Sequence, residues 1–302
     1  MAARLNEVIV IFVSIVLQSL PFVLVGVFAS ALVQHCLTGR VVARWMPRRA
    51  LPAVLMGSVC GMVVPVCDCG VIPLARRLTA KGVPVYAALT FLLAAPVVNP
   101  IVLSATALAF QGNLAVVGLR AAMTLSVAIS VGLLASALLP DARLRLPVLA
   151  RPIESQKDAE FPVPKRERAP TIVREASAEF FDIFFFVVLG GLFTAVTQTF
   201  VPRSELAAFG ARPVASVLTL MPVASVLSIC SEADAFVARA FASTFSPGSV
   251  LAFMTIGQIV DLRNGLLLFR TLGVRLVVLI VGVGYGLVLV EGVALNALLV
   301  RS

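Results

Sequence analysis

The stretch RLVVLIVGVGYGLVLVEGVALNALLV, residues 275–300, decides the fold class of this chain. An α-helix needs roughly 20 consecutive apolar residues to cross the hydrocarbon core of a bilayer, which is about 30 Å thick. The stretch is longer than this, and it lacks the alternation of apolar and polar residues that marks a strand of a membrane β-barrel. It therefore predicts a membrane-spanning α-helix.

The composition extends this prediction to the whole chain. Of its 302 residues, 60% are hydrophobic and 13% are charged, whereas about 25% of the residues of a soluble domain are charged. The first hydrophobic run is too long for the apolar region of a signal peptide, so it is expected to remain as a span. We predict an all-α integral membrane protein with about eight transmembrane segments, at residues 8–34, 51–75, 83–109, 114–139, 178–200, 214–241, 248–270 and 274–299.

A charged, proline-rich stretch at residues 140–176 divides the chain and is predicted to be a flexible linker. The regions on either side, residues 1–139 and 177–302, are expected to be duplicated membrane halves of about four hydrophobic segments each. Duplicated halves are typical of secondary transporters, whose substrate site lies between the repeats. Whether these repeats are parallel or inverted depends on the number of true crossings in each half, which the sequence leaves open.

The evidence for duplication is a set of residues that recur at constant offsets. At an offset of 172, the residues Glu7, Ile11, Phe12, Val16, Leu17 and Leu20 recur as Glu179, Ile183, Phe184, Val188, Leu189 and Leu192. At an offset of 163, the residues Val54, Leu55, Cys67, Ala75, Arg76 and Pro84 recur as Val217, Leu218, Cys230, Ala238, Arg239 and Pro247. The matches in cysteine, arginine, proline and glutamate carry the argument, because any two membrane helices share leucine and valine.

Prolines interrupt two segments of the first half at polar residues. Pro65 and Pro73 flank the sequence Cys-Asp-Cys-Gly at residues 67–70, and Pro96 and Pro100 flank an asparagine. Each proline removes a backbone donor, and in lipid the freed carbonyl groups must be satisfied by protein or by water in a cavity. We therefore predict proline-broken helices whose polar residues face one another within the membrane.

The second half carries carboxylates at matching depths. A charged side chain at the centre of a bilayer costs about 2.5 to 3.5 kcal/mol on insertion scales, so such residues are candidates for function. Together with the polar residues of the first half, they make a predicted substrate site of nine residues, with no catalytic residue and no metal ligand assigned. These are Cys67, Asp68, Cys69, Asn99, Cys230, Glu232, Asp234, Asp261 and Asn264.

Other interpretations of these residues remain open. Cys67 and Cys69 can bind a thiophilic species as thiolates, or they can be small polar groups lining a kinked passage. Their C-x-C spacing does not match a structural zinc site. Two pairs of opposite charge, Glu232 with Arg239 and Asp261 with Arg263, are alternatively structural ion pairs. For Arg120 and Glu291, the sequence does not decide between snorkelling toward the interface and facing the interior of the bundle.

Several classes of function are disfavoured by what the sequence lacks. It has no phosphate-binding loop of the type G-x-x-x-x-G-K-[ST], one histidine and no C-x-x-C pair, so we expect neither an ATP motor nor an enzyme, and no cofactor. The basic residues lie between hydrophobic segments rather than on one polar face, which favours topogenic loops over nucleic-acid binding.

Four motifs resemble those of a known family. They are VPVCDCGVIPLARRLTAKGVP at residues 64–84, AAPVVNPIV at 94–102, CSEADAFVA at 230–238 and DLRNGLLL at 261–268. The chain resembles the bacterial predicted permease family that includes the trivalent organoarsenical efflux permeases. The resemblance places Asp68 where the family more often has serine, and it implies that the family's signature positions are Cys67, Cys69, Gly70, Pro73, Asn99, Pro100, Cys230, Glu232, Asp234, Asp261 and Asn264.

The resemblance and the residues together predict a permease of the bacterial inner membrane. Its expected partners are a small molecule or ion as substrate and membrane lipid, with no nucleic acid, and the sequence leaves its oligomeric state open. In the first hypothesis, thiols contact a thiol-reactive solute such as a trivalent organoarsenical, and the acids carry coupling protons or cations. In the alternatives, acids and asparagines recognise an unrelated ion or metabolite, or the chain is a non-transporting membrane component of a larger assembly.

Overall fold

The computed structural model describes two large parts of the chain. In the first half it describes residues 47, 49–64, 66 and 68–138, and in the second half residues 213–231, 233–262, 265, 268, 269 and 272–299. It also describes residues 6–17, 20, 21 and 24 and twelve positions between 177 and 199. The described residues form helices and no strands, which confirms the prediction of an all-α protein. The predicted linker, 140–176, lies outside the described residues.

Three described helices are long and apolar enough to cross a membrane: Val85–Ala109, Leu114–Leu138 and Val274–Leu298. Shorter apolar helices accompany them, at Asn6–Leu17, Ala50–Val63, Val214–Leu227 and Pro247–Ile259. Together these helices make a multi-pass membrane protein. The count of eight spans stays a prediction, because some predicted segments divide into shorter helices and others fall partly outside the described residues.

In the first half, the predicted interruptions are real breaks between helices. The predicted segment 51–75 is divided between α3 (Ala50–Val63) and α4 (Asp68–Ala80). The segment 83–109 is divided between α5 (Val85–Val98) and α6 (Pro100–Ala109), and α7 (Leu114–Leu138) follows. Pro96 is accommodated inside α5, whereas Pro100 begins α6, a position where its missing N–H costs nothing.

The second half is built in the same order. Its helices are α10 (Pro213–Leu227), α11 (Asp234–Phe241), α12 (Pro247–Ile259) and α14 (Val274–Leu299). Between α10 and α11 the chain leaves the helix at Ser228, whose φ of 45° lies in the left-handed region. Because side chains other than glycine rarely adopt this conformation, Ser228 marks a sharp break inside what the sequence presented as one segment.

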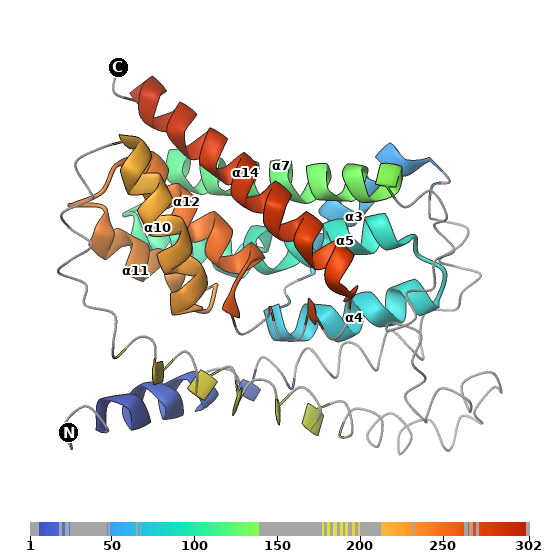
Figure 1. Cartoon of the computed structure of the whole chain (residues 1–302), viewed down its shortest axis with the longest axis horizontal. Helices are drawn as coiled ribbons and strands as arrows, with labels where there is room; N and C mark the ends of the chain where they lie inside the picture. The colour runs from blue at the N-terminus through green and yellow to red at the C-terminus, as the bar shows by residue number, and fades with distance from the viewer. Residues whose placement is uncertain are drawn as a thin grey trace.

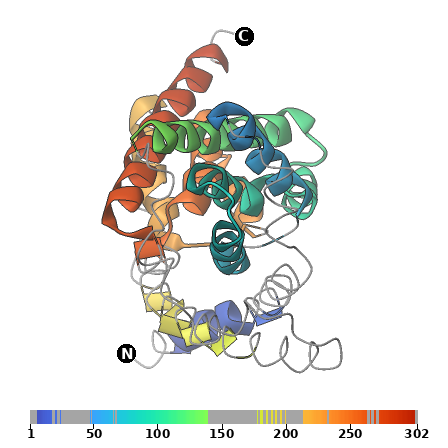
Figure 2. The same cartoon turned by 90° about the vertical axis from the view of Figure 1, so that its right-hand side faces the viewer.

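Corresponding helices of the two halves make corresponding contacts (Figures 1 and 2). In the first half α5 packs on α3, α4 and α7, and in the second half α12 packs on α10, α11 and α14. The halves meet where α7 contacts α12 and α14, and where α6 contacts α11. This arrangement places α5 and α12 at the centre, with the long helices α7 and α14 across one side (Figure 1).

The two central helices are hydrophobic all round, as buried helices are. Every residue from Ala87 to Val98 of α5 and from Gly248 to Ile259 of α12 is buried. Polar residues that follow these helices therefore lie in the interior: Asn99 follows α5 directly, and Asp261 follows α12 by two residues.

Close helix packing depends on glycine in both halves. A Cβ atom built at Gly57 of α3 would lie 2.4 Å from the carbonyl oxygen of Ala87 on α5. One built at Gly248 of α12 would lie 2.1 Å from the carbonyl oxygen of Gly292 on α14. Small residues let membrane helices approach until their backbones touch, and this contact replaces the hydrophobic driving force that is missing in lipid.

The first helix lies away from the two halves just described. The helix Asn6–Leu17 runs beside the described positions between 177 and 199 in both views (Figures 1 and 2). A Cβ atom at Gly191 would lie 3.3 Å from a methyl group of Ile15. The leading segments of the two predicted halves therefore lie side by side.

Candidate functional site

A fully buried ion pair joins the two halves. Arg120 of α7 has none of its surface exposed, and Asp234, the first residue of α11, is 1% exposed. The Nη2 atom of Arg120 donates to Oδ2 of Asp234 at 2.7 Å. Because an unpaired charge is costly inside a membrane, each of these residues requires the other in order to be buried.

Two further side chains complete a polar cluster around this pair. The Nη1 atom of Arg120 donates to the hydroxyl oxygen of Thr106 on α6 at 2.7 Å and lies 3.9 Å from the sulfur of Met254. The Nε2 atom of Gln258 on α12 donates to Oδ2 of Asp234 at 2.9 Å. We call Thr106, Arg120, Asp234 and Gln258 the buried polar cluster; each half contributes two of its members.

The break between α10 and α11 positions Asp234 for this role. The backbone N–H of Asp234 donates to the carbonyl oxygen of Cys230 at 2.9 Å, so the helical turn begins before α11 itself. An acidic residue in the first turn of a helix is favoured by the partial positive charge of the free N–H groups there. The same break also contacts the chain just after α12, because the N–H of Leu262 donates to the Ser228 hydroxyl at 3.1 Å.

Asn99 holds the break between α5 and α6. Its side-chain oxygen accepts from the N–H of Val102 at 3.0 Å, and its amide nitrogen donates to the carbonyl oxygen of Ala95 at 2.9 Å. The side chain therefore caps α6 and also binds a carbonyl group near the end of α5. With 2% of its surface exposed, Asn99 is a buried connector between two half-helices.

Four of the nine predicted site residues have described side chains: Asn99, Cys230, Asp234 and Asp261. Asp234 is in the buried polar cluster, Asp261 is 2% exposed, and Cys230 is half-buried and forms no disulfide. Asp68 and Cys69 lie in the first turn of α4, but their side chains are outside the description. Cys67, Glu232 and Asn264 lie wholly outside the described residues, as does Arg263 of the alternative ion pairs.

Three residues of the cluster were not among the predicted site residues. The sequence singled out Arg120 as the lone charge of an apolar span but did not decide its direction, and the structure places it in the interior. Thr106 and Gln258 gave no signal, because threonine and glutamine are uncharged and commonly pack in membrane helices. Glu291, the other undecided residue, accepts a hydrogen bond from the Ser126 hydroxyl across the contact of α14 with α7.

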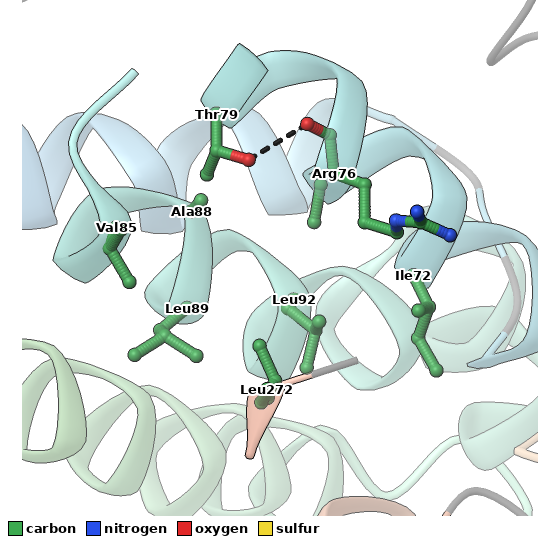
Figure 3. Close-up of a pocket in the computed structure, with 9 residues that line it drawn as sticks. Ile72, Arg76, Thr79, Val85, Ala88, Leu89, Leu92 and Leu272 are labelled. Atoms are coloured by element: carbon green, nitrogen blue, oxygen red, sulfur yellow. Dashed lines mark hydrogen bonds between the residues drawn. The ribbon is translucent and has the colours of Figure 1, made fainter. Parts of the chain in front are cut away.

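A separate apolar pocket lies between the halves (Figure 3). It is small, and its wall is formed by α4, α5 and Leu272. Ile72, Leu89 and Leu92 point into it, while the guanidinium group of Arg76 is directed away (Figure 3). None of the four described site residues lines this pocket.

Comparison with known proteins agrees with this arrangement. A family model described as a predicted permease, ArsP_1, matches residues 4–297. The UPF0718 protein YcgR of Bacillus subtilis is 38% identical over 271 residues, which cover 90% of each chain. A putative two-component membrane permease complex subunit of Streptococcus mutans is 33% identical over 280 residues, covering 91% of this chain and 90% of the relative.

No solved structure matches the chain. The family match covers both halves and all four motifs, and both relatives match nearly end to end. Apolar helices of membrane length are consistent with these matches. The chain therefore belongs to the ArsP_1 family of predicted permeases, and it is a multi-pass membrane permease.

Proposed function

We propose that this permease is a secondary transporter of the bacterial inner membrane, which moves a small solute by alternating access between its two halves. The observation that carries the proposal is the Arg120–Asp234 pair, which is fully buried and crosses from one half to the other. A scaffold gains nothing from the cost of inserting these charges, whereas a transporter needs groups that respond to an ion or solute inside the membrane.

The helix breaks support the same proposal. In secondary transporters, discontinuous helices from two repeats present their ends and irregular backbone to the substrate and the coupling ion. Here the chain breaks after α3, α5 and α10, the α10–α11 break holds Asp234 at the contact between the halves, and corresponding helices make corresponding contacts. These correspondences also support the predicted internal duplication.

A thiol-reactive solute, such as a trivalent organoarsenical, is the substrate class that we propose, with efflux as the direction. Cys230 lies in the α10–α11 break, four residues before Asp234, and is half-buried rather than sealed in the core. Cys67 occupies the equivalent place in the sequence of the first half at the offset of 163. Thiolates bind soft species of this kind.

The test is uptake of methylarsenite into everted vesicles that contain the full chain, beside growth in the presence of this compound. We expect Cys230→Ser, and Cys67→Ser combined with Cys69→Ser, to lower uptake at least tenfold. Cys60→Ser is the matched control, because Cys60 lies exposed on α3. Unchanged uptake and resistance in the cysteine variants would exclude the thiol role.

An unrelated ion or metabolite is the alternative substrate class, recognised by acids and asparagines. It is selected if a protein without cysteines still transports, while Asp234→Asn and Asp261→Asn do not. A growth panel of metalloids, metal ions and oxyanions, with and without the gene, identifies the solute in that case. Under either alternative we expect the chain to act as a transporter and not as an enzyme.

A permease subunit of a larger complex is the second candidate function. The relative in Streptococcus mutans is described as a subunit of a two-component membrane permease complex. If this chain works in the same way, it co-purifies with a second membrane protein in fixed proportion, and reconstituted flux requires both. Full flux from the isolated chain would contradict this candidate.

A further inference from the structure

Three oxygen atoms near the ion pair are buried but accept no hydrogen bond from any described residue. They are Oδ1 of Asp234, Oε1 of Gln258 and Oγ of Ser231. Buried polar atoms in proteins almost always have a partner, such as a protein group, a water molecule or an ion. Three buried acceptors that no described residue serves are therefore candidate ligands for a hydrogen-bond donor or a cation.

Local geometry brings these atoms together. The N–H of Asp234 donates to the carbonyl oxygen of Cys230, which is the hydrogen bond of a helical turn. Residues three apart in sequence, as Ser231 and Asp234 are, lie on one side of such a turn. The amide of Gln258 binds Oδ2 of Asp234 at 2.9 Å and the carbonyl oxygen of Ile229 at 3.2 Å. Gln258 thus holds Asp234 at the α10–α11 break, and Ser231 belongs to the same break.

The orientation of the Gln258 amide is fixed by its partners. The carboxylate oxygen of Asp234 and the carbonyl oxygen of Ile229 are both acceptors, so the amide group must turn its nitrogen toward them. Its oxygen then points elsewhere, into a place where no described group donates to it. The unmatched oxygen is therefore a consequence of the hydrogen bonds and not of an arbitrary assignment.

The hydrogen bonds to the Asp234 carboxylate are made to one of its two oxygens. Oδ2 accepts from both Arg120 and Gln258, whereas Oδ1 accepts from neither. A carboxylate, an amide oxygen and a hydroxyl are the ligands preferred by hard cations. Irregular backbone between two half-helices is also where broken-helix transporters place such ions.

Arg120 already neutralises the carboxylate, so a second cation adds an unbalanced charge to a buried site. The ion and the guanidinium group must therefore compete for Asp234. We propose that Asp234 Oδ1, Gln258 Oε1 and Ser231 Oγ form a site for a small monovalent cation, Na⁺ or a proton, and that Arg120 is its built-in competitor. Binding of the cation then weakens the contact of α7 with α11 and loosens one half from the other.

That this cation is the coupling ion rests on the proposed transport function, but its binding does not. The test uses the purified full chain in detergent, with ²²Na⁺ binding and the thermal unfolding midpoint measured in NaCl against choline chloride at equal ionic strength. A parallel arm measures proton uptake with a pH dye between pH 5 and pH 8 in choline chloride.

The variants have opposite expected effects. Asp234→Asn removes the charged ligand and is expected to abolish binding of either cation. Ser231→Ala is expected to weaken Na⁺ binding about tenfold, and Arg120→Gln, which removes the competitor, to tighten it at least tenfold. Ser104→Ala is the control for the serine variant, because the Ser104 hydroxyl donates to the carbonyl oxygen of Ile101 in its own helix.

Two outcomes distinguish the two cations, and two others would overturn the proposal. Na⁺-dependent stabilisation that is lost in Asp234→Asn supports sodium, and proton uptake that is lost in the same variant without any effect of Na⁺ supports a proton. Neither effect in the wild type, or equal binding by wild type and Asp234→Asn, overturns the inference. If Arg120→Gln does not fold, the comparison of Ser231→Ala with Ser104→Ala still decides the sodium arm.

The same preparation separates this inference from the proposed function. Cation binding by a protein that moves no solute in liposomes leaves the cation site standing and removes the transport role. Solute flux by a protein that binds neither cation leaves the transport role standing and removes the cation site.

Discussion

At the scale of single residues, the argument rests on the most deeply buried charges of the described chain. Arg120 is the largest fully buried side chain, and its partner comes from the other half of the sequence, 114 residues away. Removing one member of a buried ion pair leaves an uncompensated charge, and this costs more than the net contribution of the pair itself. The pair is thus a sensitive point for stability as well as for transport.

We predict that Arg120→Gln alone lowers the free energy of unfolding by about 3 to 5 kcal/mol, because it leaves the Asp234 carboxylate buried without a counter-charge. Asp234→Asn alone is expected to have a similar effect through Arg120. The double variant removes both charges and should be more stable than the sum of the single effects predicts. Thermal unfolding of the four proteins in detergent measures this coupling; additive effects would show that the two residues do not depend on each other.

Asn99 offers a second prediction, because both ends of its side chain bind backbone groups. Asn99→Ala removes the cap of α6 and should lower the free energy of unfolding by about 1 kcal/mol. Asn99→Ser keeps an acceptor for the N–H of Val102 and is expected to recover most of that loss. Unfolding midpoints separate the two variants. Wild-type stability in Asn99→Ala, with flux abolished, would instead favour the substrate-binding role predicted from the sequence.

The residue scale also shows what the sequence could not provide. The motifs selected Asn99, Asp234 and Asp261, all of which the structure buries at helix ends. Arg120 remained undecided, because the direction of a lone charge in an apolar helix depends on which helix packs against it. Thr106 and Gln258 enter the cluster only through contacts between α6, α7, α11 and α12, and no local pattern in one sequence encodes such contacts.

At the scale of elements, the breaks could be predicted better than the spans. Prolines and polar residues in apolar runs indicated the interruptions near residues 64–68 and 99. The match of Cys67 with Cys230 also indicated a broken helix near residues 230–232. The left-handed backbone at Ser228 itself could not be predicted, because no proline stands there. The predicted segments 51–75 and 214–241 each ran across a break, because a hydrophobicity pattern does not show where one helix stops and the next begins.

Helix packing gives a prediction with a matched control in one half. Gly248→Ala would place a Cβ atom 2.1 Å from the carbonyl oxygen of Gly292, where backbone must move to admit it. Such overpacking should lower the free energy of unfolding by about 1 to 3 kcal/mol. Gly282→Ala meets nothing within 4 Å and is expected to be neutral or stabilising. The same unfolding assay compares them, and equal midpoints would contradict the close approach of α12 to α14.

At the scale of the whole molecule, alternating access requires the halves to move relative to each other. Ser126 of α7 and Glu291 of α14 form a hydrogen bond across this contact. In the double variant Ser126→Cys, Glu291→Cys, a short bis-methanethiosulfonate cross-linker, which spans the space left by the longer glutamate side chain, should join the two thiols and reduce methylarsenite flux at least tenfold, and a reducing agent should restore it. The single cysteine variants, treated in the same way, are the controls. Full flux through the cross-linked protein would show that this contact does not move.

The most direct test of alternating access asks whether the site opens to both sides of the membrane, and it needs no knowledge of the solute. Cys230 lies in the α10–α11 break beside the buried polar cluster, and Cys60 lies exposed on α3 as an internal control. The measurement is modification of Cys230 by a membrane-impermeant methanethiosulfonate, applied to spheroplasts and to everted vesicles and followed by peptide mass spectrometry. We predict modification of Cys230 from both sides and none of Cys60, because the exposed face of the apolar helix α3 is expected to contact lipid. Modification of Cys230 from one side only, or from neither, would contradict the account.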